Sequence, residues 1–256
     1  MRPNYQEYGD WKSNNHNSNS NLPLSGKKMV MFGDSITEFS NFDEIIAQRT
    51  GMTVYNCGFG GCRMSRHNDA NYDVFSMTTI AESVASGDFT AQDTANIVTQ
   101  FPTLDTLKSI DFNTIDYVSI GYGTNDFTGG ITLGALEDIA TRDRFNGAIR
   151  LVIERLLTAY PHLKIFFITP LFRARQAPGD GLDSDNNSNG NWYLKEYSDT
   201  IIEVAKSRHL PVLNFHDESG INIYNHEIYF GDGLHPNQTG YNFLGNKIAA
   251  FIESHF

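Results

Sequence analysis

Cysteine is scarce in this chain, with only Cys57 and Cys62 among 256 residues. They lie five positions apart in a glycine-rich stretch, with no CxxC motif and no Cys/His pattern of the kind that binds zinc. The sequence therefore predicts two free thiols, with a disulfide across the short loop as the alternative.

Long apolar runs and an excess of positive charge are also missing. No window approaches the roughly 18 consecutive apolar residues of a membrane-spanning helix, and the start, MRPNYQEYGD, lacks the features of a signal peptide. The 30 Asp and Glu residues outnumber the 19 Lys and Arg residues, and the net charge of -11 repels nucleic acids and anionic membranes. We expect a cytoplasmic protein that binds no nucleic acid and enters no membrane, or a surface-associated or phage-associated one if the chain is part of a larger assembly.

The apolar content, 40% of 256 residues, is enough for one domain with a sizeable core. Residues 13–22 are almost entirely Asn and Ser, which favours a flexible tether. We therefore predict an N-terminal extension over residues 1–23 and one catalytic domain over residues 24–256. The residues before the tether, Trp11 among them, fit either a docking strand or a junction to another domain.

Short apolar segments alternate with longer amphipathic ones from Lys28 onward. The short ones have the β-branched and aromatic content of strands, and they cover residues 29–32, 53–56, 117–121, 164–169 and 211–215. Their apolar residues do not alternate with polar ones, which is typical of a parallel sheet covered on both faces. Apolar residues at helical spacing predict helices over 145–160, 194–204 and 241–252. Together these patterns predict an α/β fold, a three-layer α/β/α sandwich that binds ligands at the carboxyl ends of its strands.

Two stretches fit this scheme less well. Residues 62–110 are longer than an ordinary connection, and one or two helices are expected there, beside the mouth of the active site. Residues 173–193 are irregular and rich in Gly, Asn and Asp, as lids and binding loops often are. Part of this stretch alternates like a calcium loop but lacks the required glycine and glutamate, so a solvated loop is the simpler interpretation. The alternating residues are Asp183, Asp185 and Asn187.

Two polar segments follow the first two predicted strands. Ser35 in GDSIT lies on the turn after the first strand and suits a nucleophile, although Asp34 and Ser35 in such a turn more often cap a helix. The glycines of NCGFGG, residues 56–61, follow the second strand. They can direct a backbone N–H group at an oxyanion, or they can simply form a turn.

Two further segments supply an amide and an Asp/His pair. Asn125 in GTND follows the third predicted strand, and its side chain can donate to a developing negative charge, although Asn-Asp is also a common turn pair. Asp232 and His235 in DGLHP are spaced so that the carboxylate can orient an imidazole that takes the proton of a serine. The alternative for DGLHP is a helix cap beside a surface histidine.

GDSIT, NCGFGG, GTND and DGLHP occur in this order across nearly the whole chain, and they resemble the four signature blocks of the SGNH, or GDSL-type, esterases and lipases. The resemblance implies a flavodoxin-like sandwich with a five-stranded parallel sheet. It implies that Ser35 is the nucleophile and that His235 and Asp232 complete its triad. It also implies that the N–H groups of Ser35 and Gly61 and the side chain of Asn125 bind the oxyanion.

The choice of Gly61 over Gly60 depends on aligning Asn56 with the asparagine of the family's second block. With these roles the enzyme forms an acyl-enzyme on Ser35, which water then hydrolyses, and no metal or other cofactor is needed.

Phe59 and Tyr122 lie beside the signature blocks, and we expect them to bind substrate, with packing in the core as the alternative. The same two interpretations apply to Arg173 and Trp192.

The sequence thus predicts a serine esterase of short-chain, chiefly acetyl, esters. A small acyl ester or an acetylated glycan of a carbohydrate or cell-wall polymer is the expected substrate, since no long apolar stretch indicates a lipid-binding face. A longer-chain lipase or thioesterase is the alternative among enzymes. A carbohydrate-binding module of a surface or phage-tail assembly is the alternative outside them, although retention of all the signature residues argues against an inert binder.

Overall fold

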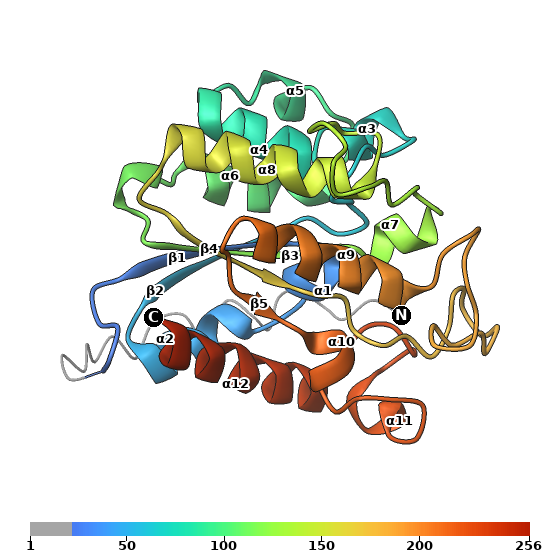
Figure 1. Cartoon of the computed structure of the whole chain (residues 1–256). Coiled ribbons are helices and arrows are strands. Elements are labelled where there is room, and N and C mark those ends of the chain that lie inside the picture. Colours follow the sequence, from blue (N-terminus) through green and yellow to red (C-terminus); the bar gives the residue numbers. More distant parts are fainter. Residues whose placement is uncertain (1–21) are drawn as a thin grey trace.

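The computed structural model describes residues 22–256, so the predicted extension over residues 1–23 lies almost wholly outside the described residues. A central sheet lies between two layers of helices (Figure 1). All five strands are parallel, in the order β2-β1-β3-β4-β5. They are β1 (Lys28–Gly33), β2 (Thr53–Gly58), β3 (Tyr117–Gly121), β4 (Lys164–Ile168) and β5 (Val212–Leu213). The predicted three-layer sandwich and all the predicted strands are confirmed.

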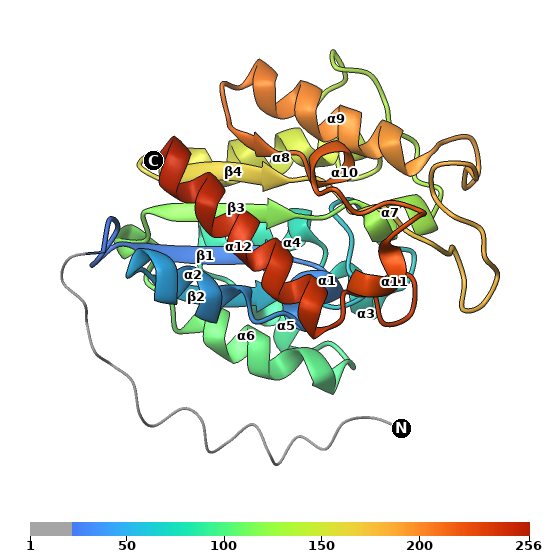
Figure 2. The same cartoon turned by 90° about the horizontal axis from the view of Figure 1, so that it is seen from below.

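The central strand β1 is apolar on both faces because each face is covered by helices. Val30 and Phe32 of β1 face one layer, and Met29 and Met31 face the other. The first layer holds α4 (Met77–Ser86), α6 (Phe101–Lys108), α8 (Phe145–Ala159) and α9 (Leu194–Ser207). The second holds α2 (Phe42–Thr50) and α12 (Gln238–His255), which lie side by side beneath the sheet (Figures 1 and 2).

The three helices predicted from apolar spacing appear as α8, α9 and α12. Residues 62–110 hold more helices than expected, because single turns are inserted around α4 and α6. Asp69 shows how such a turn forms, since its carboxylate accepts a hydrogen bond from Asn71 N and caps the helix that follows. A helix of a single turn is too short to show apolar periodicity, so the sequence pattern does not predict it. The added turns are α3 (Ala70–Asp73), α5 (Thr90–Asp93) and a 3-10 helix at Val98–Gln100.

The remaining short helices follow strands or precede α12. They are α1 (Ser35–Glu38), α7 (Thr124–Thr128), α10 (Phe215–Glu218), α11 (His226–Tyr229) and a 3-10 helix at Phe112–Thr114.

Residues 173–193 contain no helix or strand, but the loop is tied to α7. Arg173 donates to the carbonyl oxygen of Thr124 at 3.0 Å, and Asn189 donates to that of Phe127 at 2.8 Å. Asp183 is buried, and its Oδ1 accepts hydrogen bonds from the N–H groups of Asp185 and Asn186, both at 3.1 Å. Among residues 22–256, no three His, Cys, Asp or Glu side chains are grouped as metal ligands.

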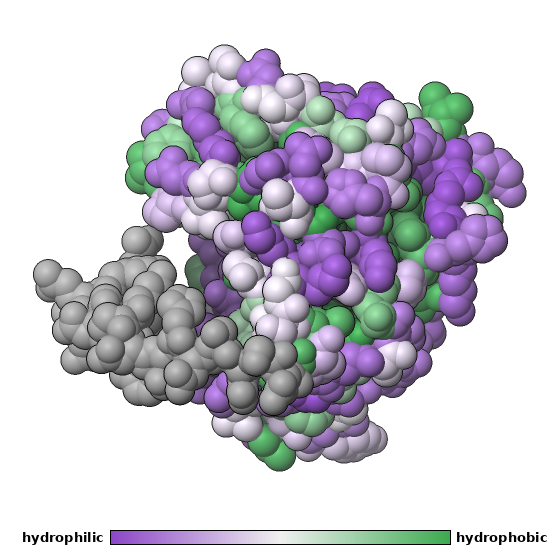
Figure 3. All heavy atoms as spheres, turned by 90° about the vertical axis from the view of Figure 1, so that its left-hand side faces the viewer, coloured by the Kyte–Doolittle hydropathy of each residue, from purple (hydrophilic) through white to green (hydrophobic). Residues whose placement is uncertain are grey.

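The prediction of two free thiols is confirmed, because Cys57 and Cys62 form no disulfide and are both buried. None of the helices over residues 22–256 combines the length and the apolarity needed to cross a membrane. Figure 3 shows the face on the left of Figure 1, where hydrophilic side chains surround separate hydrophobic spots in the coloured part.

Candidate active site

Ser35, His235 and Asp232 form one chain of hydrogen bonds, although the first two are 200 residues apart. Ser35 Oγ lies 3.0 Å from His235 Nε2, and His235 Nδ1 lies 2.9 Å from Asp232 Oδ2. Ser35 is the first residue of α1, directly after β1, and Asp34 caps this helix by accepting from Ile36 N at 3.0 Å. The helix cap and the serine suited to nucleophilic attack, which the sequence offered as alternatives, therefore occur together.

The segment that carries Asp232 and His235 is shaped by the same carboxylate. Asp232 Oδ1 accepts from the N–H groups of Leu234 and His235 at 2.9 and 2.7 Å, while Oδ2 contacts the imidazole. Gly233 between them has a φ of 80°, a left-handed conformation that glycine adopts without a steric cost. The turn thus holds the imidazole ring and its orienting carboxylate in one rigid unit.

Arg175 is a third partner of Asp232 that the sequence analysis missed. Its Nη2 lies 2.5 Å from Asp232 Oδ2, its Nε donates to the Asp232 carbonyl oxygen, and its side chain is only 13% exposed. Burial by itself raises the pKa of Asp232, but hydrogen bonds from His235, Leu234 and Arg175 together hold it well below its usual value. Asp232 is therefore anionic at any pH at which the imidazole works as a base.

The loop after β2 is fixed to α1 through Asn56. Asn56 Nδ2 donates to Thr37 O at 2.7 Å, and Asn56 Oδ1 accepts from Gly58 N at 3.1 Å. A Cβ atom on Gly58 would overlap the backbone of Glu38, so only glycine allows α1 to approach this closely. The contact brings the backbone of residues 58–61 beside Ser35.

The two candidate glycines differ in what their N–H groups face. Gly60 N–H contacts the carboxyl group of Glu38, whose pKa is raised by burial and lowered in part by this contact. Gly61 has a φ of 75°, and within the described part of the chain its N–H and that of Ser35 have no acceptor. This arrangement favours Gly61 over Gly60 as an oxyanion donor. Glu38 was not singled out by the sequence, because its place beside Gly60 depends on the packing of α1.

Asn125 lies near the start of α7 and points toward the same loop. Its Nδ2 donates to Cys62 O at 2.8 Å, which leaves the second amide hydrogen for another acceptor. The N–H groups of Ser35 and Gly61 and the amide of Asn125 are thus held by three different strand ends. Such preorganised donors can stabilise the oxyanion of an acyl-transfer reaction.

We expect Asn125→Ala to lower kcat for a short ester by about 100-fold to 1000-fold, the usual effect of removing one oxyanion donor. The measurement is steady-state hydrolysis of p-nitrophenyl acetate, with thermal unfolding recorded alongside because the bond to Cys62 O is lost as well. Asn113→Ala, at an exposed turn, is the control and should match the wild type. Activity of Asn125→Ala within threefold of wild type would remove this side chain from the oxyanion site.

Phe59 and Tyr122, which we expected either to bind substrate or to pack in the core, are buried. Their side chains are 0% and 1% exposed and belong to the core between the sheet and the α4–α9 layer. Phe59 packs against Phe75, with ring centroids 5.2 Å apart. Both residues follow strand ends closely, and their rings pack among the apolar side chains of this core, as the packing alternative describes.

Arg173 is also buried, at 2% exposure, and lies over the ring of Phe127 with 5.3 Å between guanidinium and centroid. Trp192 is partly buried and packs on the edge of the same core. For both residues the packing alternative describes the structure.

Asp34 is the buried carboxyl group closest in sequence to Ser35. Burial raises its pKa to about 7, although the N–H of Ile36 and the charge of Arg173 lower it in part. Because the folded-state pKa lies above the unfolded value of about 3.9, only the unfolded chain loses this proton between roughly pH 4 and pH 7. The contribution of Asp34 to stability is therefore complete below about pH 4 and declines as the pH rises toward 7.

We expect Asp34→Asn to remove this decline, since the amide oxygen still accepts from Ile36 N but no proton is lost. The unfolding free energy of wild type should fall relative to Asp34→Asn by up to about 1.4 kcal/mol per pH unit in this range. Urea unfolding at pH 4, 5, 6 and 7 measures the difference, and Asp105→Asn on the exposed face of α6 is the control. A difference that stays constant with pH would show that Asp34 is not protonated in the folded protein.

The comparison with protein families decides what kind of protein this site belongs to. The sequence model of the GDSL-like Lipase/Acylhydrolase family matches residues 31–243, a range that includes all the signature residues. The chain belongs to this family. The acylhydrolase is thus an ester hydrolase, as the sequence predicted.

Solved structures share the fold of this acylhydrolase. A Lactobacillus plantarum protein is 21% identical, with a TM-score of 0.68 over 91% of this chain and 99% of that chain. An acetyl xylan esterase is 17% identical, with a TM-score of 0.55 over 88% and 99% of the two chains. A carbohydrate acetylesterase from Sinorhizobium meliloti is 18% identical, with a TM-score of 0.53 over 90% and 100%. No curated protein matches the sequence.

Proposed function

We propose that this acylhydrolase is a serine esterase that removes short acyl groups, chiefly acetyl, from a carbohydrate or cell-wall polymer. The observation that carries the proposal is the hydrogen-bonded sequence Ser35–His235–Asp232, with distances of 3.0 and 2.9 Å. A serine whose hydroxyl contacts a carboxylate-oriented imidazole is the standard arrangement for nucleophilic attack on a carbonyl carbon.

In the proposed mechanism, His235 Nε2 takes the proton of Ser35 as Oγ bonds to the ester carbonyl carbon. The N–H groups of Ser35 and Gly61 and the side chain of Asn125 receive the negative charge that develops on the carbonyl oxygen. Asp232 stabilises the imidazolium and keeps its ring oriented, and Arg175 holds the carboxylate in place. The imidazolium then protonates the leaving alcohol, and an acyl-enzyme on Ser35 remains.

In the second half of the cycle, His235 removes a proton from water, and the hydroxide oxygen attacks the acyl carbon in the same oxyanion site. The tetrahedral intermediate expels Ser35 Oγ, which recovers its proton from the imidazolium. The products are a carboxylic acid and the free enzyme.

The names of two structures of this fold, an acetyl xylan esterase and a carbohydrate acetylesterase, support an acetylated carbohydrate as the substrate class.

The test is hydrolysis of p-nitrophenyl esters from acetyl to palmitoyl by the wild-type chain. We expect kcat/KM to be highest for acetyl and to fall at least tenfold by octanoyl, because the proposed substrate carries acetyl groups. Fastest cleavage of palmitoyl would support the lipase alternative. Absence of hydrolysis on every ester and on acetylated glycans would support the binding-module alternative.

A further inference from the structure

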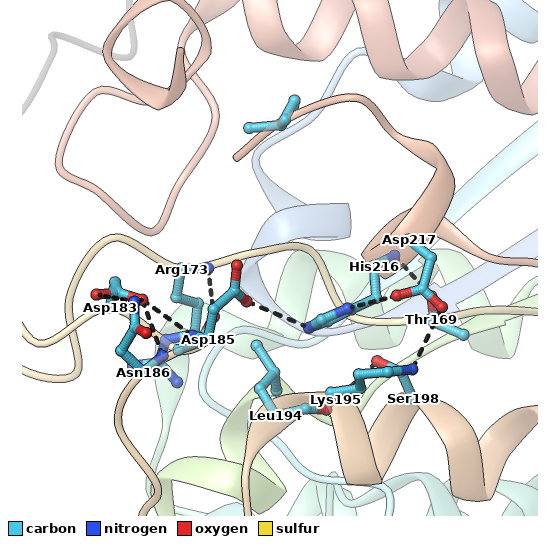
Figure 4. Close-up of polar contacts among 12 residues, drawn as sticks. Thr169, Arg173, Asp183, Asp185, Asn186, Leu194, Lys195, Ser198, His216 and Asp217 are labelled. Atoms are coloured by element: carbon cyan, nitrogen blue, oxygen red, sulfur yellow. Dashed lines mark hydrogen bonds and ion pairs between the residues drawn. The ribbon is translucent and has the colours of Figure 1, made fainter. Parts of the chain in front are cut away.

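A second and larger cavity, of about 490 Å³, lies at the carboxyl ends of β4 and β5. Its walls come from the segment after β4, the start of α9, and α10, which follows β5. Figure 4 shows His216 at its centre, between the carboxylates of Asp185 and Asp217. Nothing in the proposed mechanism uses these groups.

His216 is held with one ring nitrogen satisfied and the other unsatisfied. Nδ1 lies 3.1 Å from Asp217 Oδ1, and because an ionised carboxylate only accepts, Nδ1 carries the hydrogen. In the tautomer with the hydrogen on Nδ1, Nε2 is an acceptor. It is buried and has no hydrogen-bond partner among residues 22–256, and the whole side chain is only 7% exposed.

Asp185 faces this nitrogen across the cavity wall, with Oδ1 3.9 Å from His216 Nε2, too far for a hydrogen bond. In the described part of the chain, the Asp185 carboxylate accepts no hydrogen bond. The other carboxylates here do have donors, since Lys195 contacts Asp199 at 2.8 Å and Asp217 at 3.4 Å. Partial burial also raises the pKa of Asp185, although its side chain is 45% exposed.

Two neighbouring acceptors without donors call for a ligand that brings two adjacent donors. An anion is repelled by Asp185 and Asp217, and a metal ion finds too few ligands because His216 Nε2 and one carboxylate do not form a metal group. A pair of vicinal hydroxyls can donate to both acceptors at once. The ring of Tyr193, which is 43% exposed, lines the same cavity and suits the C–H face of a sugar ring.

We propose that this cavity binds a neutral sugar unit through vicinal hydroxyls that donate to His216 Nε2 and Asp185. The inference rests on the proposed function and deepens it, because the site lies on the same edge of the sheet as Ser35. Three strand spacings separate β1 from β5, or about 14 Å at roughly 4.8 Å each. Phe172 in the cavity wall is also three residues from Arg175, which contacts Asp232. A glycan that occupies both the active site at Ser35 and this cavity is therefore expected to bind more tightly than a small ester that occupies the active site alone.

The first test measures binding without turnover. Wild-type protein is titrated calorimetrically with unacetylated xylotetraose, cellotetraose and mannotetraose, and we expect at least one to bind. Asp185→Asn, at a half-exposed position, should raise the Kd of that sugar at least tenfold. Asp105→Asn, on the exposed face of α6, should leave it unchanged. Tyr193→Ala gives a second variant, with a severalfold increase expected.

The second measurement separates this inference from the proposed function. Asp185→Asn should hydrolyse p-nitrophenyl acetate as the wild type does, within about twofold, because that ester cannot reach the cavity. Its KM for acetylated oligosaccharides of the bound sugar should rise about tenfold with little change in kcat. If the wild type hydrolyses no ester, the proposed function fails, whatever sugar is bound. If none of the three sugars binds, if Asp185→Asn binds equally well, or if calcium alone occupies the site, the sugar site is overturned and the esterase remains.

Discussion

Ser35→Ala is expected to lower kcat for p-nitrophenyl acetate by about 10,000-fold to 1,000,000-fold, because the proposed mechanism has no other nucleophile. The fold should be kept. The Ser35 side chain makes one hydrogen bond, to His235, and begins α1 without capping it, so the change in unfolding free energy should be within about 1 kcal/mol. Steady-state kinetics and urea unfolding of the two proteins measure both effects.

A covalent probe makes the Ser35→Ala result specific. An organophosphonate fluoride should add its mass once to the wild type, on the peptide that contains Ser35, and should not label the variant. Ser254→Ala, near the exposed end of α12, is the matched control and should behave as the wild type. His235→Ala should match Ser35→Ala in kcat, and the double variant should be no slower, since residues that act as a unit are not additive. More than 1% residual activity in a clean preparation of Ser35→Ala would rule out the proposed nucleophile.

The layers of the fold were predictable because the physical constraint on them is strong. A strand covered on both faces is mainly apolar, as in 117–121 and 164–168, and few other segments of this length have such a composition. The single-turn helices α3 and α5 were not predictable, because their stability depends on caps such as Asp69 rather than on an apolar stripe. Whether a polar loop contains such a turn depends on its neighbours in the folded chain.

The candidate site was likewise predictable only in part. Ser35, Asn125, Asp232 and His235 stand at strand ends or before a helix, where parallel topology brings them together, so order and position along the chain were enough. Arg175 is 57 residues from Asp232, and no spacing rule joins them.

The sequence left open whether Phe59 packs in the core, because nearness in sequence to a signature block does not say where a side chain points. His216 could have been noticed, because NFHDE follows the last strand as GDSIT follows the first.

Asp126 shows how the family segment GTND contributes beyond Asn125. Its side chain is fully buried, and its oxygens accept hydrogen bonds from Ser65 N at 3.0 Å, Ser65 Oγ at 2.5 Å and Met64 N at 2.9 Å. The neighbouring Asn125 contacts Cys62 O. The start of α7 therefore fastens the chain over residues 62–65, directly after the proposed oxyanion donor Gly61.

Asp126→Ala is expected to lower the unfolding free energy by about 3–5 kcal/mol, because three buried donors lose their acceptor at once. Urea unfolding at pH 7 measures the loss, and Asp105→Ala should change it by less than about 0.5 kcal/mol. Asp126→Asn should fall between them, since its amide oxygen replaces one acceptor while its NH2 group faces a donor. Protein that remains folded should also hydrolyse p-nitrophenyl acetate at least tenfold more slowly, because Gly61 loses its support. A stable Asp126→Ala with wild-type kcat would mean that residues 62–65 hold their conformation without this carboxylate, and that Asn125 alone keeps the oxyanion site in place.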